Sequence, residues 1–265
     1  MKDTPQTPWH YASYQRFLHT YLPELLAANI PLSGYEVHED SAFTCTLSII
    51  ISQEEEDIRV EFTDIPQPDT EGVFHVNGRE LVIVPVADSE QLADARVLCV
   101  GELLQQAIAR HISKAPADFG WTTELLATWI PLQTWIHEFF AHHGQPLDTT
   151  NWVSWQTHLR RLVIPEWEQV WADDRKGRVC LFETPEGPNV GKVFTVARGA
   201  AIEDQKIIIK DTSPEAQLLG ISAAMIPFLE HSDPARLLMG ANMLRQWRQP
   251  LETEPAIVQT GYEPD

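Results

Sequence analysis

The segment "ETPEGPNVG" at residues 183–191 constrains the fold more than any other stretch of the chain. It combines two prolines, two glycines and two carboxylates in nine positions. Proline fixes φ and removes a backbone donor, and glycine adopts left-handed conformations, so Pro185, Gly187, Pro188 and Gly191 predict a shaped turn. Such a turn either joins two strands at the surface or presents side chains to a ligand, and the segment alone leaves both readings open.

The chain around this turn has the composition of a folded protein. Its 265 residues are 43% apolar and include nine tryptophans, which allows one large domain or two small ones with a core. It contains no run of about 18 uncharged apolar residues, and its first residues lack the apolar stretch of a secretory signal. We therefore expect a soluble, cytoplasmic protein without membrane contact. Cys45, Cys99 and Cys180 form no C-x-x-C pair, so we expect reduced, structural thiols.

The charge is strongly acidic and unevenly distributed. The net charge is −19, with 7 Lys+Arg against 22 Asp+Glu in residues 1–150 and 12 against 16 in residues 151–265. This balance argues against a free-standing nucleic-acid binder, because such proteins neutralise phosphates with lysine and arginine. The arginine clusters of the second half are read either as solvated faces or as phosphate sites.

Hydrophobic periodicity and turn signals predict mixed α and β structure. Helices are expected over residues 11–28, from Asp88 as N-cap to about 112, from Thr122 or Thr123 to about 142 with a bend at Pro131, over 154–163, and from Asp233-Pro234 to about Trp247. Strands are expected over residues 43–51, 58–62, 192–197 and 206–210, with an acidic turn at 53–57. The Asn77-Gly78 pair predicts a hairpin within residues 72–86, because both residues tolerate positive φ.

Familiar motifs of enzymes and metal sites do not occur in this sequence. The stretch "HEFFAHH" at 137–143 is similar to a zinc-protease helix, but alanine stands at position 141, where the second histidine is required. His142 and His143 lie roughly 140° and 120° around the helix from His137, which disfavours a shared metal. The chain also lacks a nucleophile elbow, a Walker phosphate loop and a dinucleotide fingerprint.

Several stretches resemble the β subunit of bacterial multisubunit DNA-directed RNA polymerase. "GRVCLFETPEGPNVG" at 177–191 is similar to that family's G-R-V-C-P-I-E-T-P-E-G-P-N-I-G signature, and "IPFLEHSDPARLLMGANMLRQ" at 226–246 resembles its I-P-F-L-E-H segment. Weaker similarities, in the family's order, are "GVFHVNGRELVIV" at 72–84, "NWVSWQTHLRR" at 151–161 and "EPAIVQTGYE" at 254–263. The resemblance is strong over the C-terminal half and weak over the first 150 residues.

The chain also departs from the family pattern. The family's glycine-rich stretch after T-H-K-R-R is replaced by "LVIPEWEQVW" at 162–171, and the stretch between the loop and "IPFLEH" is shortened. No counterpart of the family's catalytic half or of its metal-binding D-x-D-x-D run occurs in the sequence. The chain is similar to a shortened β subunit that includes the protrusion and fork regions.

The resemblance implies roles for particular residues. It implies that the following residues face nucleotide or nucleic acid: Arg160, Arg161, Arg178, Asn189, Arg236, Asn242, Arg245 and Gln246. It also implies that the following residues shape the loop or orient its arginines: Glu183, Pro185, Glu186, Gly187, Pro188, Gly191 and Glu230. Arg236 occupies the position of a phosphate clamp, which suits the planar guanidinium, whereas Met239 and Met243 are expected in the core. The alternative is that these residues interlock only to form the fold.

The fold expected from these observations is α+β in two lobes, a protrusion-like lobe of residues 1–150 and a fork-like lobe of residues 151–265. One functional hypothesis is a divergent or split polymerase subunit that works only with RNA polymerase large subunits, or with a chain that supplies the missing half of β. The other is a non-catalytic mimic that regulates or competes with the host polymerase; an independent enzyme is the least supported. The chain itself is expected to bind no cofactor, to meet Mg²⁺ only through a partner subunit, and to contact DNA or RNA only within an assembly.

Overall fold

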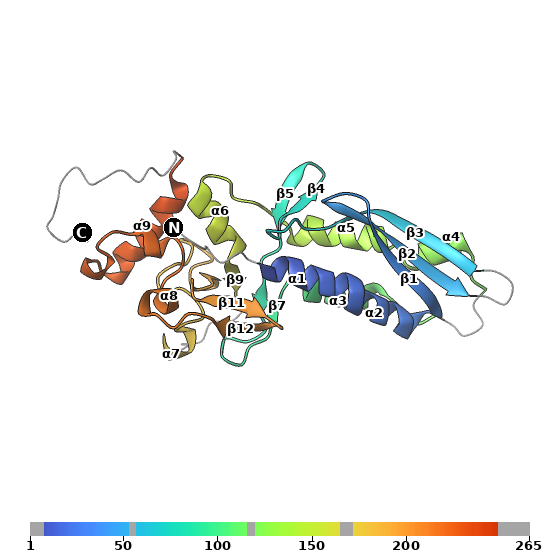
Figure 1. Ribbon diagram of the computed structural model, residues 1–265, viewed down its shortest axis with the longest axis horizontal. Helices are drawn as coiled ribbons and strands as arrows, with labels where there is room; N and C mark the ends of the chain where they lie inside the picture. Colours follow the sequence, from blue (N-terminus) through green and yellow to red (C-terminus); the bar gives the residue numbers. More distant parts are fainter. Residues whose placement is uncertain (1–7, 53–56, 116–119, 165–171, 249–265) are drawn as a thin grey trace.

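The computed structural model describes residues 8–52, 57–115, 120–164 and 172–248. The molecule is elongated, with the strands β1–β3 towards one end and the helices α8 and α9 towards the other (Figure 1). Helices occur together with several small sheets, which confirms the predicted mixed α+β class. The acidic turn predicted at 53–57 and the similarity at 254–263 fall largely or entirely outside the described residues.

The N-terminal helical run confirms the helix predicted over 11–28. It consists of α1 (Pro8–Arg16), the π-helical η1 (Phe17–Tyr21) and α2 (Leu22–Asn29). The wide turn comes directly before Pro23, and the Leu22 N–H donates to the Phe17 carbonyl five residues back. A proline inside a helix clashes with the carbonyl of the preceding turn, and a π turn provides the room that it needs.

The first core lies between this run, a three-stranded sheet and three further helices. The strands β1 (Leu32–Glu39), β2 (Thr44–Ser52) and β3 (Asp57–Pro66) are antiparallel in the order β1-β2-β3. The helices are α3 (Val100–His111), α4 (Thr123–Trp129) and α5 (Leu132–His143), and α3, α5 and η1 pack together. Tyr14, Phe17, Leu47, Phe74 and Phe140 are fully buried at the centre of this core.

The predicted hairpin and the helix pair at 122–143 are present. In β4 (Phe74–Val76) and β5 (Arg79–Val82), the two turn residues Asn77 and Gly78 have φ of 51° and 72°. The short strand β8 (Gln145–Pro146) pairs with β5. Thr122 caps α4 by accepting from the Leu125 N–H, and the expected bend at Pro131 is a complete break between α4 and α5.

The helix predicted from Asp88 is wrong in its first half. Residues 86–98 form β6 (Val86–Ala87), a loop and β7 (Val97–Leu98), and α3 begins only at Val100. The Asp88 carboxylate closes the loop by accepting from the Arg96 N–H at 2.7 Å. The helix is capped instead by Cys99, whose N–H donates to Glu102 at 3.1 Å. Strand pairing and burial of Val97 thus override the local helix signal.

A second core is built around the sheet β10-β9-β6-β7. Its strands β9 (Arg161–Val163) and β10 (Val193–Thr195) are antiparallel, β6 runs parallel to β9, and the hairpin of β11 (Ala200–Glu203) and β12 (Lys206–Ile209) packs beside them. Buried Trp9, Val97, Leu162, Phe194 and Ile202 fill this core. The sheet takes strands from both sides of residue 150, and the division into two lobes there remains a prediction.

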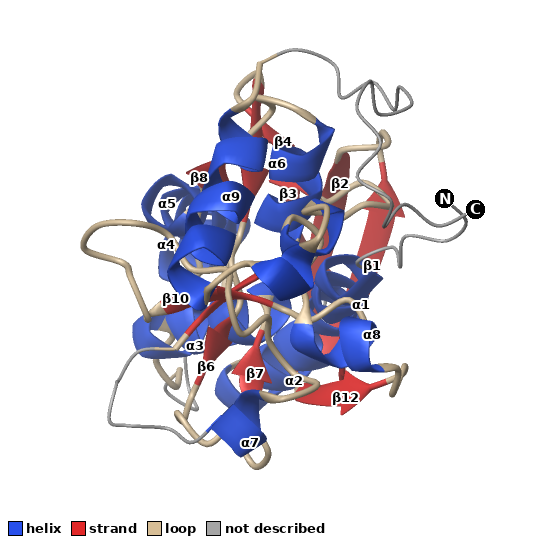
Figure 2. Ribbon diagram, turned by 90° about the vertical axis from the view of Figure 1, so that its left-hand side faces the viewer, coloured by secondary structure: helices blue, strands red, loops and turns tan. Residues whose placement is uncertain are grey.

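The remaining helices lie between residues 152 and 246. They are α6 (Trp152–Leu159), α7 (Ala172–Arg175), α8 (Pro214–Leu218), η2 (Ala223–Met225), η3 (Leu229–His231) and α9 (Pro234–Gln246). The helix expected over 154–163 ends early because residues 161–163 form β9. The final helix is confirmed, with Asp233 accepting from the Arg236 N–H. Helix α9 packs on α6 and η2, and Figure 2 shows α6 and α9 on the same face of the molecule.

Candidate functional site

The proline-glycine loop is a closed, shaped turn that leads into β10. Gly187 and Gly191 have φ of 96° and 71°, the left-handed region that favours glycine. The Gly191 N–H donates to the Thr184 Oγ1 at 2.8 Å, and the Val190 N–H donates to the Gly187 carbonyl at 3.0 Å. These bonds confirm the predicted shaped turn and fix the direction in which residues 184–186 point.

A buried carboxylate fastens this loop to α9. Glu183 is 1% exposed, its Oε1 accepts from the Ala223 N–H at 2.6 Å, and its Oε2 lies 3.4 Å from the Arg245 Nη1. Burial raises the pKa of Glu183, and the bonds from Ala223 and Arg245 oppose that shift. The predicted role of Glu183 in orienting an arginine therefore has a matching geometry.

Arg245 is held from further sides. Its guanidinium donates to the Ser222 Oγ at 3.3 Å and to the Asn242 Oδ1, and the Asn242 amide donates in turn to Glu186 Oε1 at 3.1 Å. Carboxylate, hydroxyl and amide partners come from three different segments of the chain. This network fixes the guanidinium at one wall of a cavity.

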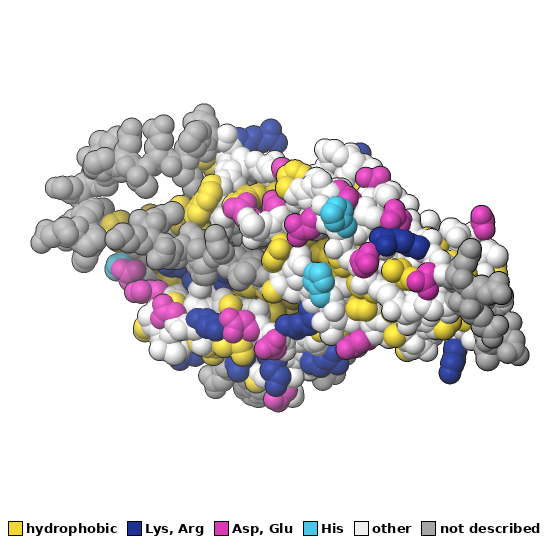
Figure 3. All heavy atoms as spheres, turned by 45° about the vertical axis from the view of Figure 1, so that its right-hand side comes forward, with side chains coloured by type: hydrophobic (Ala, Val, Ile, Leu, Met, Phe, Trp, Pro, Cys, Tyr) yellow, Lys and Arg dark blue, Asp and Glu magenta, His cyan; other side chains and the backbone are white. Residues whose placement is uncertain are grey.

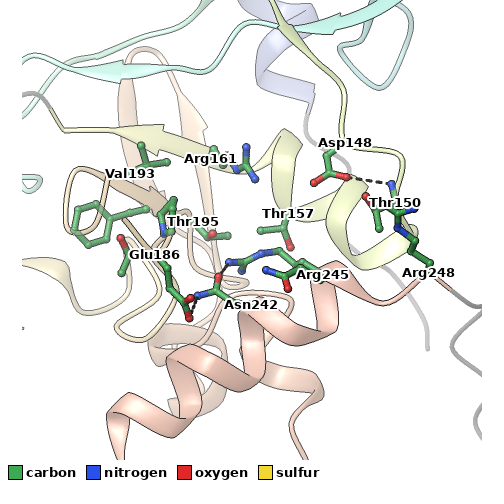
Figure 4. Close-up of a pocket in the computed structure, with 14 residues that line it drawn as sticks. Asp148, Thr150, Thr157, Arg161, Glu186, Val193, Thr195, Asn242, Arg245 and Arg248 are labelled. Atoms are coloured by element: carbon green, nitrogen blue, oxygen red, sulfur yellow. Dashed lines mark hydrogen bonds between the residues drawn. The ribbon is translucent and has the colours of Figure 1, made fainter. Parts of the chain in front are cut away.

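The cavity has a volume of about 560 Å³ and lies between the loop, β9–β10, α6 and α9 (Figure 4). Its cationic side chains are Arg161, Arg245 and Arg248, and its carboxylates are Asp148 and Glu186. Threonines also line it: Thr150, Thr157, Thr184 and Thr195. A lining of guanidinium groups and hydroxyls offers many hydrogen-bond donors to a ligand.

Arg161 points into this cavity from the start of β9. Among the residues that the structure describes, none accepts a hydrogen bond from its guanidinium or forms an ion pair with it. Burial and the like charge of Arg245 lower the pKa of Arg161, while Asp148 opposes the shift. The side chain is thus a partly desolvated cation whose donors are available.

Part of the predicted set meets at this cavity. Arg161, Asn242, Arg245 and Gln246, expected to face nucleotide or nucleic acid, line it together with the loop residues Pro185 and Glu186. Glu186 contacts the amide of Asn242, although an arginine was expected as its partner.

Arg160 was expected to face nucleotide or nucleic acid, and the structure places it in the core, away from the cavity. Its side chain is completely buried, donates to the carbonyls of Val196, Ala197 and Ala200, and lies 5.1 Å from the centre of the Trp9 ring. Burial lowers the pKa of Arg160 to about 10. It joins the N-terminal helix to the second core.

Arg236 and Glu230 also lie outside the cavity. The Arg236 side chain is 76% exposed and its Nε lies 3.2 Å from Asp233 Oδ2, so it stands at the outer end of α9. Glu230 is 72% exposed and faces His231 at 3.6 Å, outside the loop network where it was expected. Both were expected near the loop because residues 226–246 resemble the family's I-P-F-L-E-H segment, and the structure places them in η3 and in the first turn of α9.

The other predicted residues have surface or structural positions. Asn189 is exposed at the loop, where its carbonyl accepts from the Lys192 and Val193 N–H groups, and Arg178 donates to the Asp174 carbonyl at 2.9 Å. Met239 and Met243, expected in the core, are 54% and 62% exposed. Helix α9 presents its other face to the protein, with Leu237, Ala241 and Asn242 buried.

The predicted set of site residues did not include several residues of the cavity, namely Asp148, Arg248 and the lining threonines. One sequence signal pointed towards Thr157, which lies with Arg161 in the stretch at 151–161 that resembles the family. His158 follows Thr157, and burial, together with the charge of Arg161, lowers its pKa to about 4. The His158 Nδ1 accepts from the Asp148 N–H at 3.0 Å, which fixes the loop before α6.

Residues 145–202 are similar to domain 3 of the RNA polymerase subunit Rpb2. The matched stretch runs from β8 through α6, β9 and the proline-glycine loop to β11. It supplies Asp148, Thr157, Arg161, Thr184 and Glu186 to the cavity, whereas α9 lies outside it. The match supports an RNA polymerase β-type subunit region in this part of the chain.

No helix among the described residues is long and apolar enough to cross a membrane. The three cysteines are free and buried, as expected. Burial is the main cause that raises the pKa of Cys45 and Cys180 to about 12.

Proposed function

We propose that the chain acts in transcription as a β-type component of an RNA polymerase assembly. Within that assembly the cavity beside the proline-glycine loop faces nucleotide or nucleic acid, and RNA polymerase large subunits, or a chain supplying the rest of β, are its partners. Mg²⁺ reaches the reaction through a partner subunit, and the protein works in the cytoplasm. The bacterial type of the subunit and its identification with the protrusion and fork regions are part of the same proposal.

The observation that carries the proposal is a coincidence of two results. The segment that resembles Rpb2 domain 3 is also the segment that builds most of the arginine- and threonine-lined cavity. Guanidinium groups recognise phosphate through parallel, charge-assisted hydrogen bonds, and nucleic acids and nucleotides present phosphate. A similarity confined to a solvated turn would lend less support.

Affinity purification of the full chain from its native cells tests the assembly. Large polymerase subunits should co-purify with it, and recovery of the chain alone contradicts the proposal. In a reconstituted assembly that transcribes a template, Arg161→Gln should reduce the rate, because a charge-assisted contact is worth about 1.5–3 kcal/mol. The matched control is Arg236→Gln, which removes the same charge from an exposed site outside the cavity.

The same reconstitution addresses the alternative of a non-catalytic mimic. Added to a complete polymerase, a β-type component should leave transcription unchanged or replace its counterpart. A dose-dependent inhibition that survives in the Arg161→Gln variant would favour the mimic.

A further inference from the structure

One charged side chain in the cavity lacks the partners that its neighbours have. Arg160, next to it in sequence, donates to three backbone carbonyls, and Arg245 is paired with Glu183. The Arg161 guanidinium, in contrast, has no hydrogen bond and no close ion pair in the described part of the chain, and the carboxylate that acts on it from farther away is Asp148. A partly buried cation beside a second cation costs folding free energy, and an anion in the space between them would remove that cost.

The surroundings of Arg161 suit an anion with several oxygens. In Figure 4, Arg161, Thr157 and Arg245 lie around the same space. The Thr157 and Ser222 hydroxyls are 2.9 Å apart, and Ser222 accepts from Arg245. When Ser222 donates its proton to Thr157, the Thr157 hydroxyl proton is left for a ligand.

A second hydroxyl reaches the cavity from the loop. The Thr184 Oγ1 accepts from the Gly191 N–H, and its own proton is not used by that bond. Donors from β9, α6, α9 and the loop thus converge on one cavity.

The carboxylates of the cavity have hydrogen-bond partners of their own. Glu186 accepts from the Asn242 amide, and Asp148 Oδ1 accepts from the Thr150 N–H at 3.1 Å. Neither carboxylate lies within ion-pair distance of Arg161. The cavity lining carries three arginines against these two carboxylates, and because Arg245 is paired with Glu183, Arg161 and Arg248 are the cations left for an anionic ligand.

We propose that the cavity binds a phosphate group between the guanidinium groups of Arg161 and Arg245, with Thr157 and Thr184 as further donors. The inference rests on the proposed function only for the source of the phosphate, a nucleotide or an RNA strand. The site belongs to the chain itself, so the isolated protein binds phosphate without a polymerase partner. Arg236, the clamp expected from the sequence, takes no part.

Isothermal titration calorimetry of the full chain in a phosphate-free chloride buffer tests the site. The probes are inorganic phosphate, uridine monophosphate and a short oligouridylate. Binding of one phosphate group per chain is expected, weakened about tenfold or more by Arg161→Gln and unchanged by Arg236→Gln. Arg161→Lys keeps the charge but loses the planar fork, so an intermediate loss is expected.

The possible outcomes distinguish a single phosphate group from a strand as the ligand, and they show whether the site exists. Binding of all three probes identifies a single phosphate group as the ligand, and binding of the oligouridylate alone identifies a strand. Equal loss in Arg161→Gln and Arg236→Gln would show general charge attraction and overturn the site, as would absence of binding by every probe. Circular dichroism establishes that each variant is folded.

The proposed function fails independently of this site. Phosphate binding by a chain that recovers no polymerase subunits would leave the site standing and refute the assembly. Recovery of those subunits by a chain that binds no phosphate would support the assembly and refute the site.

Discussion

Glu183 Oε2 lies 3.4 Å from the Arg245 Nη1, joining the proline-glycine loop to a helix that begins some fifty residues later. The Glu183 side chain is fully buried, and the Arg245 side chain is 11% exposed. Pairing removes much of the cost of burying both charges, and the loss of one partner leaves the other uncompensated. Arg245 of this pair lines the cavity, and the pair stabilises the fold.

Glu183→Gln should therefore lower the free energy of unfolding by about 3 kcal/mol, because Arg245 loses its counter-charge while the shape of the side chain is kept. Urea denaturation measures the change. The control is Glu230→Gln, at an exposed glutamate, which should change stability by less than about 0.5 kcal/mol. Equal effects of the two substitutions would show that the buried pair contributes no more than a surface carboxylate.

Gly101→Ala should destabilise the contact between α1 and α3. A Cβ at Gly101 would lie 2.0 Å from the Ser13 carbonyl oxygen, a backbone atom that cannot turn aside. Separation of the two helices is expected to lower the unfolding free energy by about 2 kcal/mol or more. At Gly120 an added Cβ meets nothing within 4 Å, so Gly120→Ala, the matched control, should be neutral or slightly stabilising. Thermal denaturation of the two variants decides the matter.

The stability of the protein should fall as the pH decreases below neutrality. Burial lowers the pKa of His10 from 6.5 to about 4, while its Nε2 bonds the Leu159 carbonyl. The unfolded chain therefore binds a proton near pH 6.5 that the folded chain takes up only near pH 4. The stability that this pKa difference of His10 contributes is present in full above pH 6.5 and is lost as the pH falls towards 4.

His10→Gln keeps a donor for Leu159 and removes this titration. Between pH 7 and pH 5 the wild-type chain should lose about 2 kcal/mol more than the variant. Urea denaturation at both pH values measures the difference, and the exposed His38→Gln serves as the control for removal of a histidine. Parallel losses in wild type and His10→Gln would show that His10 does not titrate in this range.

Local signals predicted the parts of the fold that are determined locally. Asn77-Gly78 specified a hairpin and Asp233-Pro234 a helix start, because positive φ and free helix amides are properties of a few adjacent residues. The loop at 183–191 was recognised as a shaped turn for the same reason. The helix signal at Asp88 failed because β6 and β7 pair with strands, and that pairing depends on residues far along the chain.

The candidate site shows the same limit. Arg160 and Arg161 are adjacent and were predicted to act together, yet one side chain enters the core and the other the cavity. The position at which α6 ends and β9 begins decides which of the two side chains enters the core, and no local residue type in the sequence indicates that position. Similarly, α9 was predicted with its bounds nearly correct, but the face that Met239 and Met243 occupy depends on what packs against the helix.

The isolated chain should bind duplex DNA weakly. On the face in Figure 3 the acidic side chains are interspersed with lysine and arginine, and the chain carries a net charge of −19. Few phosphates can be neutralised along a duplex by such a surface, whereas a single phosphate can enter a cavity. Fluorescence anisotropy in about 150 mM salt should give a dissociation constant well above micromolar. A submicromolar value would contradict this expectation.

Arg161→Gln should stabilise the isolated chain, although it removes a side chain that we propose binds phosphate. The wild-type guanidinium is partly desolvated and lies near the like charge of Arg245, so a neutral amide should raise the unfolding free energy by about 1 kcal/mol in a buffer without oxyanions. Inorganic phosphate should then raise the melting temperature of the wild type more than that of the variant, because a ligand that binds the folded state shifts unfolding in proportion to its affinity. Scanning calorimetry with and without phosphate measures both effects. Destabilisation by Arg161→Gln in oxyanion-free buffer would mean that Arg161 contributes to the fold, and the account of an unsatisfied cation awaiting an anion would be wrong.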